Sequence, residues 1–191
     1  MKALSIFVSG LFTMIVMQAN SQDAMPKGFK NGSITLANNT EITGFIKDDI
    51  RNRAAVIVIP ASGTKKTTYD GDKLNNVTID ETKYICMKGD FFKVVCDGEL
   101  SFLQKSSDAS SKPVYVGTEA MFINGTEGKP GDYFIYNKTI KQLQLVNNKN
   151  VAEVTAQAFI NCEAAITKAK QSANDIALLK DAVEIYNNRN N

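Results

Sequence analysis

The sequence predicts an α+β fold: an antiparallel β-meander, sandwich or partly closed barrel, followed by two to three C-terminal helices. Two observations support this prediction. From residue 33 to residue 146, apolar and polar side chains alternate and are interrupted at short intervals by Gly, Asn and Asp, as is typical of antiparallel strands. After residue 150 the apolar side chains recur every three or four positions, as they do along one face of a helix.

Residues 1–21 are predicted to be a signal peptide. Lys2 gives a positive start, residues 3–17 form an almost uncharged apolar run, and residues 19–21 offer small side chains to a signal peptidase. The apolar run is shorter than the roughly 20 residues that a transmembrane helix needs. We therefore expect cleavage before Gln22. The mature chain is expected without a transmembrane anchor, in the periplasm, on the outer cell surface or in the extracellular space.

The mature chain has the length of one cooperative domain. We expect it to consist of a β-rich part, 22–149, with a helical tail, 150–191, packed on it. The full sequence contains 22 basic and 20 acidic residues, a net charge of +2. This near-neutral balance argues against nucleic acid as a partner, because binding to phosphates needs clustered Lys and Arg side chains.

Two hairpins are expected at the start of the β-rich part. Their turns, at residues 37–40 and 60–63, contain the Asn, Ser, Pro and Gly residues that tight turns favour. The four strands are, in chain order, 33–36, 41–47, 55–59 and 65–69.

The centre of the β-rich part is predicted to be a three-stranded meander. Its turns fall at residues 89–90, within Lys88-Gly89-Asp90, and at 97–98, where Asp97-Gly98 is a strong hairpin signal. Both faces of these strands carry apolar residues, so we expect the meander to lie centrally in the sheet. The two turns predict the pairs Ile85–Val94 and Val95–Leu100.

Two segments after the meander are predicted to be mobile loops. Residues 106–112 are polar with nothing to bury, and residues 124–132 contain three Gly and a Pro. Between them, residues 114–123 are either one bulged strand or a small hairpin turning at 117–118, and the sequence leaves both alternatives open.

A last hairpin, 133–136 with 142–146, leads into the helical tail. Asn150 is expected to cap the first helix, a second begins after Asn161, and Ser172 or Asn174 caps a third. The third helix has its apolar residues at three-and-four spacing. Its expected core positions are Ile176, Leu179, Val183 and Tyr186, with Leu178 and Ile185 widening the stripe.

The chain contains no His and three Cys. The absence of His removes the usual general base, the Ser-His and Cys-His nucleophile pairs and the commonest zinc ligand. Because Cys86, Cys96 and Cys162 are odd in number, at least one thiol is unpaired or bonds between molecules. We interpret Cys86 and Cys96 as small apolar fillers and Cys162 as a buried structural thiol. The sequence predicts no catalytic, cofactor-binding or metal-ligating residue and no cofactor.

Five short motifs are spread over most of the length of the mature chain. They are Glu41-Ile42-Thr43-Gly44-Phe45-Ile46, Asp97-Gly98-Glu99-Leu100-Ser101-Phe102-Leu103, Tyr133-Phe134-Ile135-Tyr136, Phe159-Ile160-Asn161-Cys162 and Val183-Glu184-Ile185-Tyr186-Asn187. In these motifs the chain resembles small exported proteins from Bacteroidota that have a β-rich domain, a C-terminal helical tail and no established activity. The resemblance implies an exported location and an outline of the fold, but no catalytic residue.

The leading functional hypothesis is a non-enzymatic binding or structural module of the cell envelope or extracellular space. Loops on a rigid sheet are where function usually lies, so we expect residues 106–112 and 124–132 to contact an unknown protein or glycan partner.

Two alternatives remain open from the sequence. A carboxylate pair could cleave a glycosidic bond, and the candidates are Asp70, Asp72, Glu99 and Asp132. A carrier of a small apolar ligand would need a hollow interior, and its candidate lining is Phe92, Phe102, Phe122 and Phe134.

Overall fold

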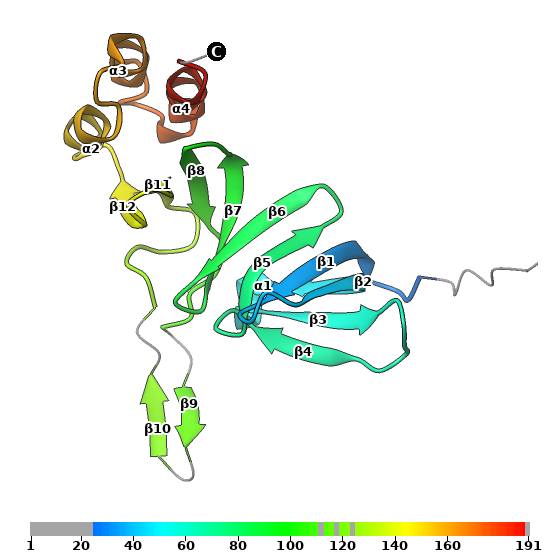
Figure 1. The fold of residues 1–191 in the computed structure, drawn as a ribbon. Helices are drawn as coiled ribbons and strands as arrows, with labels where there is room; N and C mark the ends of the chain where they lie inside the picture. Colours follow the sequence, from blue (N-terminus) through cyan, green and yellow to red (C-terminus); the bar gives the residue numbers. More distant parts are fainter. Residues whose placement is uncertain (1–24, 111–112, 117–118, 123–124, 190–191) are drawn as a thin grey trace, which may run out of the picture.

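The computed structural model describes residues 25–110, 113–116, 119–122 and 125–189, and it has the predicted α+β architecture (Figure 1). The predicted signal peptide lies outside the described residues. The strands are β1 (Lys30–Leu36), β2 (Glu41–Asp49), β3 (Ala55–Pro60), β4 (Thr67–Asp70), β5 (Leu74–Ile79), β6 (Thr82–Met87), β7 (Asp90–Cys96), β8 (Leu100–Lys105), β9 (Pro113–Val116), β10 (Glu119–Phe122), β11 (Tyr133–Asn137) and β12 (Gln142–Val146). The helices are α1 (Ile50–Arg53), α2 (Val151–Ala158), α3 (Glu163–Lys170), the 3-10 helix η1 (Ile176–Leu178) and α4 (Leu179–Asn187).

Ten strands form one antiparallel sheet, which is not closed into a barrel. Their order is β12-β11-β8-β7-β6-β5-β1-β2-β3-β4. The predicted hairpins β1–β2, β3–β4 and β11–β12 are confirmed, and the meander β6–β8 lies inside the sheet as expected. Strands β9 and β10 pair with each other in a separate two-stranded sheet.

Strands β1–β5 curl around one apolar core, which Phe91 of β7 also enters. The curl brings the end of β4 to the β6–β7 turn, where Gly71 forms an isolated bridge with Gly89. A Cβ atom at Gly71 would lie 2.2 Å from the carbonyl oxygen of Gly89, so this close approach requires glycine. The buried residues of this core are Ile34, Ile46, Ile50, Ala54, Val56, Val58, Leu74, Val77, Ile79, Phe91 and Ala109.

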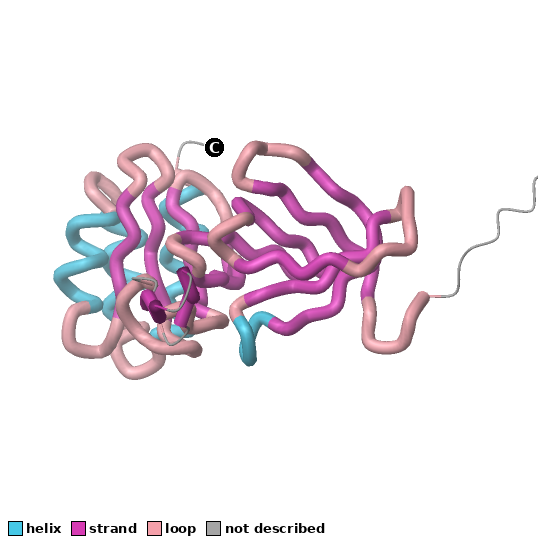
Figure 2. Tube along the Cα trace, turned by 90° about the horizontal axis from the view of Figure 1, so that it is seen from below, coloured by secondary structure: helices cyan, strands magenta, loops and turns pink. Residues whose placement is uncertain are grey.

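The C-terminal helices cover one face of the other half of the sheet. Helix α4 lies against β7 and β8, and α2 lies against β12. Figure 2 shows these helices gathered at one end of the molecule. In the core that they share with the sheet, Phe102 stacks on Tyr133 with ring centroids 5.1 Å apart, and Phe159 contacts Tyr186 at 5.5 Å.

The last helix presents a narrower apolar stripe than predicted. Leu178 and Ile185 are 51% and 37% exposed, so the prediction that they widen the stripe is wrong. Helix α4 packs on one sheet face, so only the side chains on the side of the helix that contacts the sheet become buried. The four predicted core positions are confirmed as buried: Ile176, Leu179, Val183 and Tyr186.

The helix caps also differ from the prediction. The Asn150 side chain donates to the carbonyl oxygen of Leu145 at 2.8 Å and makes no capping bond to α2. Before η1, Asp175 accepts from the backbone N–H of Ala177 at 3.0 Å, in place of the predicted Ser172 or Asn174. In both cases the side chain bonds to a backbone group that lies within five positions of it along the chain.

The β6–β7 turn lies one residue earlier than predicted. Ile85 therefore pairs with Phe92 and not with Val94. The prediction is wrong because Asp90 does not occupy the turn. It begins β7, where its carboxylate is buried against Lys105.

The β7–β8 pairing is also wrong in the prediction. A bulge between Val94 and Cys96 shifts the register, so Val95 does not face Leu100. The Asn187 side chain accepts from the N–H of Leu100 at 3.0 Å and donates to its carbonyl oxygen at 2.9 Å. Because this partner comes from α4, 87 positions along the chain, no local sequence pattern could indicate it.

All three cysteines are free, which confirms the interpretation of Cys86 and Cys96 as apolar fillers and of Cys162 as a buried structural thiol. Cys86 packs against the core of the curled half, whereas Cys96 and Cys162 belong to the core under the helices. Burial raises the pKa of the Cys86 thiol from 9.0 to about 12, so this group remains protonated at neutral pH.

Candidate functional site

Two charged side chains are completely buried together at the ends of β7 and β8. Asp90 begins β7 and Lys105 ends β8, and both side chains are 0% exposed. The Nζ atom of Lys105 lies 3.1 Å from Oδ2 of Asp90. Charges buried in this way must be paired and hydrogen-bonded, because they lose their hydration. We call these two residues the anchor pair.

The Lys105 ammonium holds the loop that precedes β11. Its Nζ donates to the backbone carbonyl oxygens of Thr126 at 2.8 Å, Glu127 at 3.2 Å and Gly128 at 3.0 Å. Together with Asp90 these bonds surround the charged group, and they draw the loop backbone over the end of β8.

The Asp90 carboxylate holds both loops at once. Oδ1 accepts from the N–H of Ala109 at 2.7 Å, and Oδ2 accepts from the N–H and hydroxyl of Thr126 at 2.8 and 2.7 Å. The Ser107 hydroxyl donates to Oδ1 at 3.4 Å and accepts from the N–H of Phe91 at 2.8 Å. The anchor pair therefore binds residues from before β9 and from after β10.

These contacts correct the prediction of mobile loops with nothing to bury at 106–112 and 124–132. In the described parts, Ser107 and Ala109 are 0% and 3% exposed. Polar composition misled the prediction because the partner of these polar groups is a buried carboxylate and not water.

The two loops meet at a narrow neck formed by Ser110 and Gly125. A Cβ atom at Gly125 would lie 3.0 Å from the Asp90 carboxylate and 3.1 Å from the backbone nitrogen of Ser110. Beyond the neck, β9 and β10 form the hairpin that the sequence left as one of two alternatives, with Val116 opposite Glu119. Figure 1 shows this hairpin standing clear of the ten-stranded sheet.

An apolar surface occupies the face of β6, β7, β8, β11 and β12 opposite the C-terminal helices. Its centre is buried, and Phe92 packs edge to face against Phe134 with ring centroids 5.2 Å apart. Around this centre lie six partly buried large apolar residues, none of them from a described helix. We call the whole set the apolar face: Phe92, Leu103, Phe134, Ile85, Met87, Val94, Tyr136, Leu143 and Leu145.

The loop held by Lys105 borders the apolar face. A Cβ atom at Gly128 would lie 3.1 Å from the Phe134 ring and 3.3 Å from a methyl group of Leu145. The anchor pair thus fixes both the neck of the hairpin and the edge of the apolar face.

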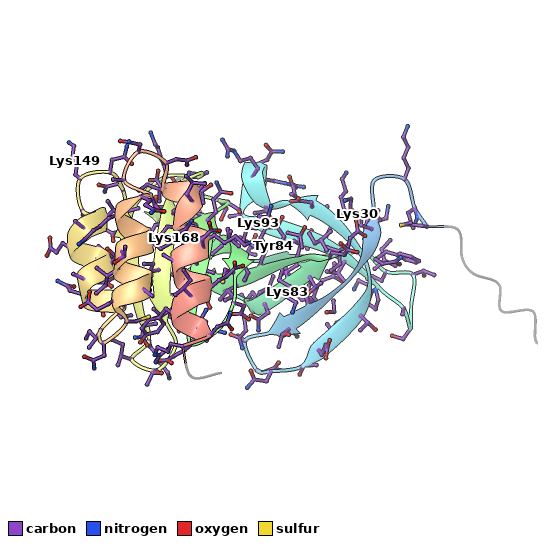
Figure 3. The ribbon with its side chains drawn as sticks, turned by 90° about the horizontal axis from the view of Figure 1, so that it is seen from above. Lys30, Lys83, Tyr84, Lys93, Lys149 and Lys168 are labelled. Atoms are coloured by element: carbon purple, nitrogen blue, oxygen red, sulfur yellow. The ribbon has the colours of Figure 1, made fainter. Side chains whose placement is uncertain are left out.

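A small polar hollow is the second candidate site. Tyr84 and Lys93 pair across β6 and β7, and Figure 3 shows them between the helical end and the curled strands. The hollow beside Tyr84 has a volume of about 260 Å³, below the roughly 300–1,000 Å³ of typical ligand pockets. It is lined by Asp48, Ile50, Arg51, Tyr84, Gln104, Lys105, Ser106 and Gly131.

The four candidate carboxylates each have a separate local role. Asp72 pairs with Lys73 at 2.8 Å, and Glu99 pairs with Arg189 at 2.7 Å. Asp132 accepts from the backbone N–H of Lys129 at 2.8 Å. Asp70 ends β4 and Asp72 follows it in the turn before β5, whereas Glu99 and Asp132 lie in other parts of the fold.

The candidate phenylalanines do not line a common cavity. Phe92 and Phe134 belong to the apolar face, whereas Phe102 lies in the core under the helices. All three are 0% exposed in packed clusters. Phe122 pairs with Pro113 in the separate hairpin, and its side chain is not described.

Within the described ranges, no group of three or more Cys, Asp or Glu side chains is placed to hold a metal ion. Among the same residues, no helix has the length and apolar character needed to cross a bilayer.

No known family model matches the chain, and no curated protein or solved structure shows significant similarity to it. The resemblance to exported Bacteroidota proteins stays a prediction. The site must therefore be interpreted from its own geometry.

Sequence reasoning missed the anchor pair. It interpreted Asp90 as part of an ordinary Lys-Gly-Asp turn and gave Lys105 no role. The one available signal was a lysine at the end of the largely apolar segment Leu100–Lys105, which also contains Ser101 and Gln104, directly before a polar segment.

Proposed function

We propose that this chain is a non-enzymatic binding module of the cell envelope or extracellular space, and that it contacts a protein partner through the apolar face. The observation that carries the proposal is the set of six large, partly buried apolar side chains on a sheet surface to which no described helix contributes. Contiguous apolar surface of this kind is typical of interaction sites. Aliphatic side chains dominate it, which favours a protein over a glycan.

The neighbouring anchor pair supports the same proposal. It holds the loops on either side of the hairpin through buried charged hydrogen bonds. A surface whose borders are already ordered loses less conformational entropy on binding.

Crosslinking capture from the native cell envelope tests the proposal. Leu143→Lys places a charge on the apolar face, and Ile140→Lys places the same charge on a 63% exposed residue of the same hairpin, outside the face. We expect wild type and Ile140→Lys to capture the same protein, and Leu143→Lys to lose it. Capture of nothing by wild type, or equal capture by all three, would contradict the proposal.

Export has its own test. The N-terminus of the chain isolated from the envelope or medium is expected at Gln22, as mass spectrometry would show. A chain that starts at Met1 and remains in the cytoplasm would contradict export without bearing on the apolar face.

A further inference from the structure

The β9–β10 hairpin is an apolar element that pairs only with itself in the sheet topology. Apart from Pro113 and Glu119, its two strands consist of Val, Tyr, Ala, Met and Phe. An isolated two-stranded hairpin is marginally stable in water. Such an element gains stability when it packs on another apolar surface.

Among the described residues, the apolar face is such a surface. The hairpin, however, extends away from the strands that form the apolar face (Figure 1). The neck at Ser110 and Gly125 is held against the buried Asp90 carboxylate. This attachment fixes the point where the hairpin leaves the domain. Because the hairpin extends away from its own sheet, contact with another molecule is favoured over contact with its own apolar face.

We propose that two copies of this chain exchange their β9–β10 hairpins, so that each hairpin packs on the apolar face of the other copy. This inference rests on the proposed function and names its partner. Each copy carries both complementary elements, so one two-fold axis satisfies both contacts at once. The net charge of +2 opposes such self-association only weakly.

Sedimentation velocity of the mature chain, residues 22–191, over about 1–100 µM measures the predicted dimer, whose population must rise with concentration. Two variants remove one element each. Leu143→Lys alters the apolar face, and Met121→Lys/Phe122→Lys replaces two apolar residues of β10 with charged ones. We expect each variant to raise the dimer dissociation constant about 100-fold, while Ile140→Lys leaves it unchanged.

Mixing the two variants gives the sharpest result. The hairpin variant keeps an intact apolar face and the face variant keeps an intact hairpin, so one of the two exchange contacts can form between them. We expect a heterodimer in the mixture at concentrations where each variant alone is monomeric. Circular dichroism verifies that each variant is folded.

Three results would overturn the inference: a monomeric wild type at about 100 µM, a dimer that persists in both variants, or no complex in the mixture. A monomeric wild type that still captures another protein through Leu143 would refute the exchange and leave the proposed function standing. Loss of both dimer and capture would refute both.

Discussion

The two halves of the ten-stranded sheet bury their apolar side chains in different ways. In the curled half, one face of β1–β5 forms a closed core, and the other is mostly polar, with exposed Glu41, Thr43 and Lys47 beside the cross-strand pair Phe45 and Ile59. In the other half, both faces of β7, β8, β11 and β12 carry apolar residues. The helices cover one of them, and the second is the apolar face.

The two halves therefore differ in how their second sheet face is packed. A sheet with one polar face needs no further cover, whereas a sheet that is apolar on both faces needs packing on both sides. The curled half meets its requirement within the chain. In the helical half, no described helix contributes to the second apolar face, and we propose that a partner covers it.

The largest expected effect concerns the anchor pair, because both of its charges are completely buried. Lys105→Met should lower the free energy of unfolding by about 3–5 kcal/mol, since the Asp90 carboxylate stays buried without its partner. Urea denaturation measures this change. Lys93→Met, at an exposed position on β7, should change it by less than about 0.5 kcal/mol.

The double variant Asp90→Leu/Lys105→Met completes this test. It removes both charges and should recover part of the loss. If Lys105→Met lowers the free energy of unfolding by no more than Lys93→Met does, the stability of the fold does not depend on the anchor pair.

The next prediction concerns the close approach of Gly71 to Gly89 in the curled half. Gly71→Ala should cost about 1–3 kcal/mol, because the new methyl group meets the carbonyl oxygen of Gly89 and the ring of Phe91. Gly63→Ala is the matched control, since nothing lies within 4 Å of a Cβ atom there. Equal unfolding midpoints for the two variants would show that the curl does not depend on this approach.

A smaller effect is expected where α4 meets the sheet. Asn187→Ala removes two hydrogen bonds to the backbone of Leu100 and should cost about 1–2 kcal/mol. Asn188→Ala changes an exposed neighbour on the same helix and should be nearly neutral in thermal unfolding. A neutral Asn187→Ala would mean that the β7–β8 bulge does not need the helix.

The smallest effect concerns Cys86, whose thiol should not change stability at neutral pH because it is protonated in both the folded and the unfolded chain. Its raised pKa means that the folded state keeps a proton that the unfolded state loses. Stability should therefore fall as the pH rises from about 9 towards 12.

Alkylation followed by mass spectrometry measures the same property. With a pKa of about 12, roughly one Cys86 thiol in ten thousand is ionised at pH 8, so native Cys86 should resist iodoacetamide. In urea, all three cysteines should react. Rapid labelling of native Cys86 would show that the curled half opens readily.

Local sequence patterns predicted most of the strands and helices. The turn residues near Asn38 and Gly63 predicted the first two hairpins, and the spacing of Leu179, Val183 and Tyr186 predicted the buried stripe of the last helix. These features depend on neighbours within a few positions. The register at Ile85 and at Leu100 was wrong because it depends on Lys105 and Asn187, which lie far along the chain.

The sequence by itself determined the α+β class, the central position of the meander and the apolar role of Cys86 and Cys96, whereas the structure shows that all three thiols are free. Periodicity and turn chemistry act over short distances, so they can be interpreted from one chain. Only the tertiary structure decided that Asp90 and Lys105 meet in a buried pair, that the polar loops are anchored by it, and that one apolar face has no helix over it. Those outcomes depend on which strands become neighbours and on which side the helices pack, and pairwise contacts between distant residues decide both.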